Sequence, residues 1–418
     1  MEVSTNHTLN IALLSTELAK EAWYNTFWAK LAGFQEITET NGIKQTKMAP
    51  NVVVQMVRDF VAEGRDNLLA AMLMPLSEDP VYGDTQLKGT GEDMSLKYVR
   101  LYINQVRKAV TKLSGRMSNQ RVKSFNLMEK AKPALVEWWS KWYNAALFQT
   151  MYEGVSPQLS AGTNDDGLGL KYRWHPNQYG FTTSTNVLTE IGTAKKTKTD
   201  AEMLQIDSTA TEDADHYMLE ELNALIKTEL LIEPILTDNG APFWLLLVHP
   251  QVMKCLKRDS TILQYVRNSA FMGELNKHPA IQGRDFMYYD GICILEETTG
   301  VRSVPTKQSN AAVVDLAGSG WTLPPTGGAA RCYGNILLGK NALALGIAEN
   351  LTFTEETEDH GNTIEIGSRC IQGANRVEYF SETDESTVFD KNKATKTSLD
   401  AAYTASNQSS AIIWCEGA

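Results

Sequence analysis

The sequence predicts an α+β fold distributed over two or three domains. The chain has 418 residues, 43% of them hydrophobic, which is enough for large buried cores. Residues 97–104 alternate apolar and polar side chains, the pattern of a half-buried strand. Residues 121–153 repeat apolar side chains every three or four positions, which is typical of a long helix.

The first 34 residues indicate an arm that contains a helix. Apolar residues at helical spacing share one face: Leu18, Ala22, Trp23, Phe27 and Leu31. Trp23 and Trp28 need a surface that covers them, which belongs either to the same chain or to a neighbour. The next segment, 37–48, is polar and turn-rich, and 52–60 reads as helical or mixed.

A long hairpin is predicted next. Residues 68–76 read as a strand that ends at Pro75, and 97–104 return as the second strand. Gly83 and Asp84 begin a polar, glycine-bearing tip that runs to residue 93. The core of a single chain rarely needs such a projection, whereas contacts between chains often use one.

The helix at 121–153 is expected to lie across a sheet. Trp138, Trp139 and Trp142 make it apolar over more than one face. Pro133 implies that the helix begins one turn earlier or bends there, and Gly154 provides a stop.

A second domain is expected after a surface excursion at 156–198. Its elements are a helix capped by Thr211, a buried strand at 243–248, a helix at 251–268, and strands at 287–296 and 311–316. Strands then return within 351–380, around a turn at 359–362, and 411–415 form a last strand.

Composition excludes several classes of protein. The 39 Lys and Arg residues against 50 Asp and Glu residues leave a net charge of −11, which argues against nucleic-acid binding through bulk charge. The five cysteines are scattered without a C-x-x-C pair, as in proteins of reducing compartments. The longest apolar stretches are about half of the ~18 residues that span a bilayer, and no signal peptide is recognisable. We therefore expect a soluble chain made in the cytosol and no membrane partner.

Motifs for catalysis or metal binding are weak. Residues 334–341 come within one residue of a phosphate-binding loop, but Asn341 replaces the Ser or Thr that binds magnesium, and the apolar residues favour a buried strand. The acidic run around Asp215 and His216 is more typical of a helix start than of a metal site. His249 favours a structural role, and the lysines of 195–198 a solvated loop. We predict that the chain is not an enzyme and uses no cofactor or metal.

The order of these segments resembles the major capsid proteins of tailed phages with the Hong Kong 97-type fold, and more narrowly the N-four-type major capsid protein family. The likeness runs from about residue 49 to residue 380. It is carried by these segments: Gly64-Arg65-Asp66, the glycine-plus-acid tip 83–93, 102–110, the helix 121–154, 247–250, 291–296, 337–339 and 361–380. Two positions depart from the family pattern, since Asn104 replaces an acid and His360 an aromatic residue.

The resemblance implies a division of the chain. It assigns 1–48 to an N-terminal arm, 49–66 to the start of a peripheral domain, and 67–112 to an extended β-hairpin, the E-loop. It then assigns 113–200 to the peripheral domain with its long spine helix and surface excursion, 201–350 to an axial domain, and 351–418 to peripheral return strands and a C-terminal tail.

The implied function is a major capsid protein that self-assembles into the icosahedral shell around the double-stranded DNA of a tailed bacteriophage. Implied partners are copies of itself in pentamers and hexamers, a portal protein, a separate scaffolding protein and a decoration protein, with DNA enclosed without sequence-specific binding. The implied location is the virion capsid, after assembly in the bacterial host cytoplasm. The residues implied to contact neighbouring subunits are Trp23, Phe27, Trp28, Leu31, Asp84, Lys88, Glu92, Asp93, Arg100 and Arg107.

Two alternatives stay open at this point. The same fold is used by encapsulin-like compartments, which enclose protein cargo. The second alternative is a cytosolic enzyme with an unrecognised site.

Overall fold

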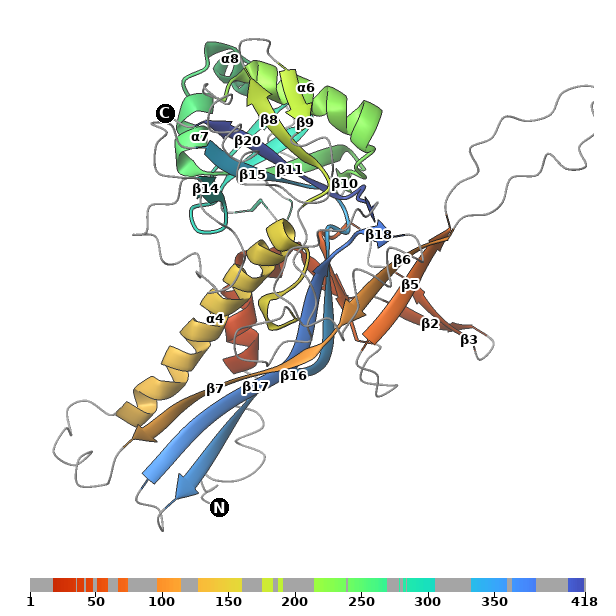
Figure 1. Ribbon diagram of the computed structural model, residues 1–418. Coiled ribbons are helices and arrows are strands. Elements are labelled where there is room, and N and C mark those ends of the chain that lie inside the picture. Colours follow the sequence, from red (N-terminus) through yellow and green to blue (C-terminus); the bar gives the residue numbers. More distant parts are fainter. Residues whose placement is uncertain are drawn as a thin grey trace, which may run out of the picture.

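The computed structural model describes residues 18–34, 36–40, 43–47, 51–58, 67–73, 96–113, 127–159, 175–182, 187–190, 214–237, 240–268, 278, 281–282, 284–304, 332–358, 363–380 and 405–416. Figure 1 shows a compact upper part, a long lower part, and hairpins that project sideways.

The upper part contains a nine-stranded sheet with helices packed against it (Figure 1). Its strands are β8 (Gln178–Thr182), β9 (Val187–Glu190), β10 (Ile235–Leu236), β11 (Pro242–Val248), β12 (Phe286–Tyr289), β13 (Ile292–Glu296), β14 (Arg302–Val304), β15 (Cys332–Leu338) and β20 (Ser410–Glu416). Its helices are α6 (His216–Leu225), which continues as the π-helix η3 (Ile226–Leu230), α7 (Pro250–Leu256) and α8 (Ser260–Asn268).

The strand β11 lies at the centre of this sheet, between β13 and β15. Residues 243–248 are all buried, because both faces of the sheet are covered and a central strand must then be apolar throughout. The predicted buried strand is confirmed.

The lower part contains a five-stranded sheet in the order β1-β4-β16-β17-β7. Its strands are β1 (Ala32–Phe34), β4 (Val54–Val57), β7 (Asn104–Leu113), β16 (Leu343–Glu358) and β17 (Thr363–Arg376). The helix α4 (Leu127–Glu153) runs along β17 and β7 (Figure 1). Trp139 is fully buried there and donates from Nε1 to Ser368 Oγ at 2.8 Å. The prediction of a long helix across a sheet is confirmed.

Both ends of α4 match the sequence signals. The helix begins at Leu127, more than one turn before Pro133. It ends at Gly154, whose φ of 81° lies in the left-handed region that glycine adopts without strain, and whose N–H donates to Thr150 O. The predicted glycine stop is confirmed.

Two hairpins and a short strand pair complete the fold. β5 (Asn67–Leu73) and β6 (Leu96–Tyr102) pair antiparallel from Asn67↔Tyr102 to Leu73↔Leu96, which confirms the two strands of the predicted long hairpin. β18 (Tyr379–Phe380) and β19 (Ala405–Ser406) join their sheet beside β6. β2 (Glu36–Thr40) and β3 (Ile43–Lys47) form a separate two-stranded sheet.

Several predicted elements differ from the structure. Residues 52–60 were expected to be helical or mixed, but Val54–Val57 form β4, because the segment inserts in parallel between β1 and β16. Residues 251–268 form two helices, because Asp259 accepts from Thr261 N–H and starts α8 anew. Residues 287–296 form two strands joined by Asp290 and Gly291, whose φ values of 43° and 86° make a tight turn. Residues 37–48 contain β2 and β3 instead of turns alone.

The nine-stranded sheet takes its strands from distant parts of the chain. β8 and β9 fall within 113–200 and β20 within 351–418, whereas its other strands fall within 201–350. The predicted division into domains stays a prediction. Buried Phe181 and Leu188 explain why the predicted surface excursion joins a core. The predicted strand 311–316, the hairpin tip 83–93, the lysine cluster 195–198 and the turn 359–362 lie outside the described residues.

Candidate functional site

The segment that resembled a phosphate-binding loop is a strand in the core. Residues 332–338 form β15, and Asn335 is fully buried. A Cβ on Gly334 would lie 2.9 Å from the Trp414 ring, and a Cβ on Gly339 would lie 2.4 Å from Glu233 O. These glycines therefore permit close packing, and the predicted buried strand is confirmed.

The acidic run before α6 provides a helix cap. Asp215, and not Thr211, is the N-cap, and its side chain accepts from Met218 N–H. His216 Nδ1 lies 2.7 Å from Asp259 Oδ2, which links α6 to the start of α8. Burial disfavours the charged Asp259 carboxylate, but hydrogen bonds from His216 outweigh burial and lower its pKa. Among the described residues, no group of three or more His, Cys, Asp and Glu side chains could hold a metal ion.

The other reactive side chains have structural roles. His249 is the N-cap of α7, with Pro250 next to it, and its ring stacks on Tyr333 at 4.1 Å between centroids. The thiols of Cys255, Cys293, Cys370 and Cys415 are buried, and they form no disulfide among the described residues. Burial raises the pKa of Cys370 to about 12, so its thiol stays protonated and unreactive near neutral pH. Among the described residues, no helix is long and apolar enough to cross a lipid bilayer.

The β5–β6 hairpin is attached at a closely packed root. Where β6 passes into β7, the chain crosses β17 so closely that a Cβ on Gly373 would lie 1.9 Å from Tyr102 O. Asn375 donates to Arg100 O at 2.6 Å. Leu101 and Ile103 pack with Val57 in a small cluster of their own. These contacts fix the direction in which the hairpin leaves the body.

The charged residues expected to bridge subunits fall in different places. Arg100 lies on β6 at the hairpin root, with Nη1 3.3 Å from Tyr102 Oη. Arg107 lies beyond the hairpin, exposed on β7. Asp84, Lys88, Glu92 and Asp93 lie outside the described residues. A bridging role for all six stays a prediction.

The arm residues are covered by their own chain, one of the two options that the sequence left open. Phe27, Trp28 and Leu31 are buried, and Trp28 packs on Phe148 of α4 at 4.8 Å between ring centroids. Trp23 is partly buried and contacts Tyr143 edge-on.

The arm also connects the two parts of the molecule. Phe27 N–H donates to Asn144 Oδ1 of α4, while the guanidinium of Arg284 lies 4.1 Å from the Phe27 ring. A contact between subunits through Phe27, Trp28 or Leu31 stays a prediction, and it would require the arm to leave this position.

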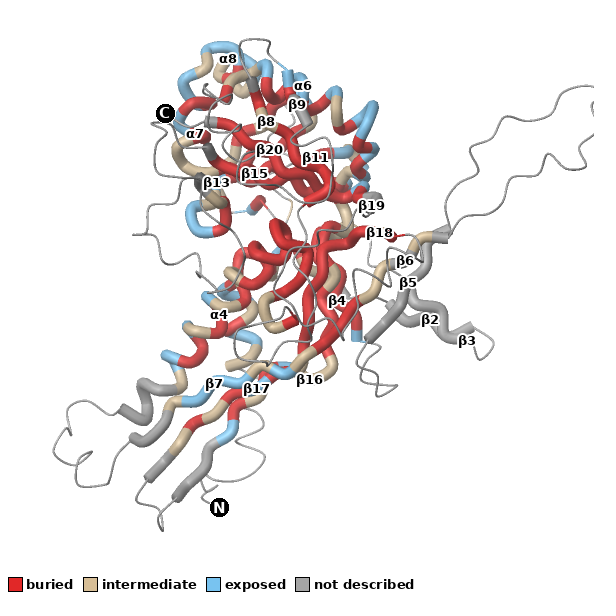
Figure 2. Tube along the Cα trace, viewed as in Figure 1, coloured by how far each residue is buried: buried red, intermediate tan, exposed pale blue. Residues whose placement is uncertain are grey.

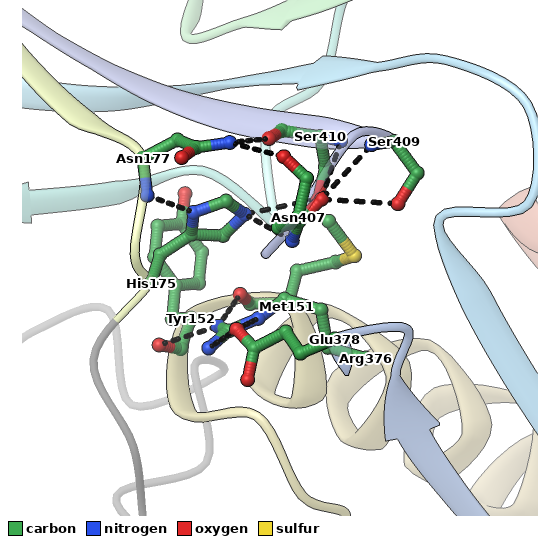
Figure 3. A network of polar contacts seen from close by, with 9 residues as sticks. All are labelled: Met151, Tyr152, His175, Asn177, Arg376, Glu378, Asn407, Ser409 and Ser410. Carbon is green, nitrogen blue, oxygen red and sulfur yellow. Dashed lines mark hydrogen bonds and ion pairs between the residues drawn. The ribbon is translucent and has the colours of Figure 1, made fainter. Parts of the chain in front are cut away.

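A buried polar network joins the end of α4 to the nine-stranded sheet (Figure 3). Arg376, fully buried at the end of β17, pairs with buried Glu378 and donates to the backbone oxygens of Met151 and Tyr152. Beside it, His175 Nε2 lies 2.9 Å from Ser410 Oγ of β20.

The two parts are further tied at the last residues of α4. Tyr152 Oη donates to Gly334 O at 2.5 Å, and Glu153 pairs with Arg302 at 2.6 Å. We call the residues around Arg376, Glu378, His175 and Tyr152 the joint. The joint was not predicted from the sequence, although the two opposite charges on either side of Val377, Arg376 and Glu378, were its available signal.

Comparisons with known proteins indicate the family of the chain. A family model described as phage capsid protein matches residues 9–407. None of the curated proteins matches the chain. Among solved structures, the chain is similar to the head of Helicobacter pylori bacteriophage KHP40, with a TM-score of 0.58 and 11% identity over 95% of this chain and 92% of that one.

Two further capsids show the same fold. The likeness to the Cyanophage Pam1 capsid has a TM-score of 0.57 and 16% identity, over 88% of this chain and 90% of that one. The capsid of Ralstonia phage GP4 follows with a TM-score of 0.54 and 15% identity, over 88% of each chain. The predicted α+β fold of the Hong Kong 97 type is confirmed.

The family match covers almost the whole chain, and its members are shell proteins and not enzymes. It therefore favours a phage shell over an encapsulin-like compartment or an enzyme. The chain belongs to the phage capsid protein family: it is a major capsid protein, which associates with copies of itself to form the virion shell.

Proposed function

We propose that the shell encloses the double-stranded DNA of a tailed phage, and that the β5–β6 hairpin acts as its E-loop and lies across a neighbouring subunit. The observation that carries this proposal is the shape of the hairpin. It leaves the body from a root fixed by Gly373 and Asn375 and extends away from both large sheets (Figure 1). Among the described residues, β18 pairs with β6 only at Phe380↔Tyr98. A two-stranded ribbon beyond that point gains little stability from its own chain, so an adjoining subunit is its natural support.

Repetition of such contacts builds the shell. Each hairpin contact is heterologous, because the ribbon of one copy meets a different surface of the next, and such contacts close into rings. Pentamers and hexamers are the rings that we propose. Many modest contacts added together give a stable shell while single errors can still dissociate.

The remaining partners are proposed on the resemblance alone. They are a portal protein, a separate scaffolding protein and a decoration protein, with assembly in the bacterial host cytoplasm. The acidic net charge of −11 supports an inner surface that encloses DNA without gripping its phosphates.

Removal of the hairpin tip tests the proposal. We expect the full chain without residues 83–93, co-expressed with its genomic neighbours, to give folded monomer and no particles in negative-stain microscopy. A matched variant replaces the same residues with a Gly/Ser segment of equal length, which keeps the connection but removes the side chains. Normal particles from both variants would refute the E-loop role.

A further inference from the structure

One face of the lower sheet packs against α4, and the opposite face stays open among the described residues. On β17, Ile366 and Cys370 belong to the buried cluster that includes Trp139 of α4. Arg369 precedes Cys370 and is exposed, because successive side chains of a strand point to opposite faces of the sheet. Arg369 therefore marks the open face.

Two arginines lie side by side on this open face. Arg107 of β7 stands directly across from Arg369 in the register of the two strands, and it is also exposed. Like charges in opposite positions of a sheet repel each other. Arg369 Nε lies 3.1 Å from Glu349 Oε1, whereas the side chain of Arg107 has no ion-pair partner among the described residues. Arg107 thus supplies a positive charge that a carboxylate from another chain would neutralise.

The same face carries an acid that also lacks a partner. Glu365 comes four residues before Arg369 on β17, so both side chains point to the same face, about 13 Å apart along the strand. Glu365 is partly exposed, and its carboxylate has no ion-pair partner within the described part of the chain. Between the two charges lie Gly367 and Ala109, which stand opposite each other in the register and have no long side chain. The open face therefore has a positive end and a negative end.

Such a face is complementary to a second copy of itself. When one copy is turned about a two-fold axis that passes over Gly367, its negative end lies over the positive end of the other copy, and the reverse also holds. The same contact is then made twice, as in any isologous interface. Packed sheets lie about 10 Å apart, a gap that an arginine and a glutamate side chain can bridge from opposite sides. A shell also needs further contacts, because rings closed by heterologous contacts must still be joined to one another.

We propose that two subunits from neighbouring rings pack the open faces of their lower sheets together about a two-fold axis, with Glu365 of each copy against Arg107 of the other. The occupant is a second copy because this chain associates with itself, and because the charges of the face complement a reversed copy. The resemblance implies a subunit contact for Arg107 without a partner, and Glu365 is that partner here. The inference rests on the rings of the proposed function but is independent of the E-loop.

Charge exchange tests the pairing. We expect Arg107→Glu to reduce the particle yield about tenfold in full-length protein co-expressed with its genomic neighbours, because two carboxylates then meet at both copies of the contact. The monomer should fold normally, since the new carboxylate stands across from Arg369 in its own sheet, and circular dichroism verifies this. The double variant Arg107→Glu, Glu365→Arg should restore particles, because each subunit then carries both reversed charges. Lys254→Glu, an exposed reversal on α7, is the control for net charge.

A chemical crosslink gives a second readout, which reports the symmetry of the contact. Ala109 lies near the proposed axis, so assembled Ala109→Cys protein should give covalent dimers with a short bis-maleimide. Longer chains of linked subunits should not form, because a two-fold contact joins copies in pairs. Wild-type particles, whose described cysteines are buried, are the control.

Normal particle yield from Arg107→Glu would overturn the proposal. So would a folded double variant that gives no particles, together with an Ala109→Cys variant that gives no dimers. All of these proteins retain residues 83–93, so the result of the tip deletion does not bear on them, and the two proposals fail separately.

Discussion

Polar residues are buried and paired in the joint, whereas on the outer strand of the lower sheet they are exposed. In the joint, Arg376 and Glu378 are fully buried and neutralise each other, and His175 and Ser410 share a hydrogen bond without access to water. On the lower sheet, Arg107 is exposed beside a like charge. Figure 2 shows the same contrast, with buried residues concentrated at the centre and exposed ones along the lower strands.

This contrast separates two functions of one subunit. A buried charge tolerates little displacement, because a lost partner leaves it unsolvated. The joint therefore holds α4 and the nine-stranded sheet in one relative orientation. Exposed charges and unpaired strand edges are solvated in the free subunit, so they can change position at little cost. They are stabilised when the surface of a neighbouring subunit covers them. A shell needs both, since rigid subunits set the curvature of the shell and adaptable hairpins and edges make the contacts between subunits.

The largest expected effect comes from breaking the joint. Arg376→Met leaves the Glu378 carboxylate buried without its partner and removes a donor from Met151 O and Tyr152 O. We expect a loss of about 3–5 kcal/mol in the free energy of unfolding. Urea denaturation of the monomer measures it.

The matched control lies on the same strand. Arg369 pairs with Glu349 but is half exposed, so Arg369→Met should cost about 1 kcal/mol or less. The double variant Arg376→Met, Glu378→Met should recover much of the loss, because it leaves no buried charge. Equal losses in the free energy of unfolding for Arg376→Met and Arg369→Met would show that the joint is not the rigid centre of the subunit.

A smaller loss of stability is expected from a substitution at the root of the β5–β6 hairpin. Gly373→Ala would place a Cβ 1.9 Å from Tyr102 O, so the backbone between β6 and β7 must shift. We expect about 1–3 kcal/mol of destabilisation. The particle yield should fall by more than the loss of stability explains, because a shift of that backbone changes the direction in which the hairpin leaves the body.

Gly367→Ala on the same strand is the control for this change. There the new Cβ would meet only the Thr354 side chain, at 3.0 Å, which can move. Denaturation gives the stability of both variants, and particle counts give assembly. Intact particles from Gly373→Ala at wild-type yield would contradict a fixed hairpin root.

The fold followed from the sequence where the signal was local. The apolar repeat that includes Trp138 and Trp142 predicted α4, and the alternation around Leu101 predicted β6, because each pattern repeats over several turns or residues. The joint could not be predicted, because Arg376 and His175 are about 200 positions apart and meet only through the strand order of two sheets. The burial of Trp28 was left open for the same reason, since a tryptophan pattern does not identify the surface that covers it.

The smallest expected effect is a dependence of the free energy of unfolding on pH. It tests whether water and protons reach the joint in the folded protein. Burial, followed by the nearby positive charge of Arg376, lowers the pKa of His175 well below its usual value. The hydrogen-bond partners of its ring nitrogens among the described residues are neutral groups of Ser410, Asn177 and Asn407. The folded protein therefore keeps His175 neutral, whereas the unfolded chain binds a proton below a pH of about 6.5.

Because the unfolded state then binds more protons, the free energy of unfolding should fall as the pH falls below about 6.5. The expected contribution of His175 between pH 7 and pH 5.5 is about 1 kcal/mol, from a limiting slope of about 1.4 kcal/mol per pH unit. Denaturation of wild-type and His175→Gln protein at both pH values isolates it, since only the difference between pH values is compared. An unchanged pH dependence in the variant would mean that acid reaches the joint of the folded subunit, and the orientation of the two parts would then be adjustable during assembly instead of fixed beforehand.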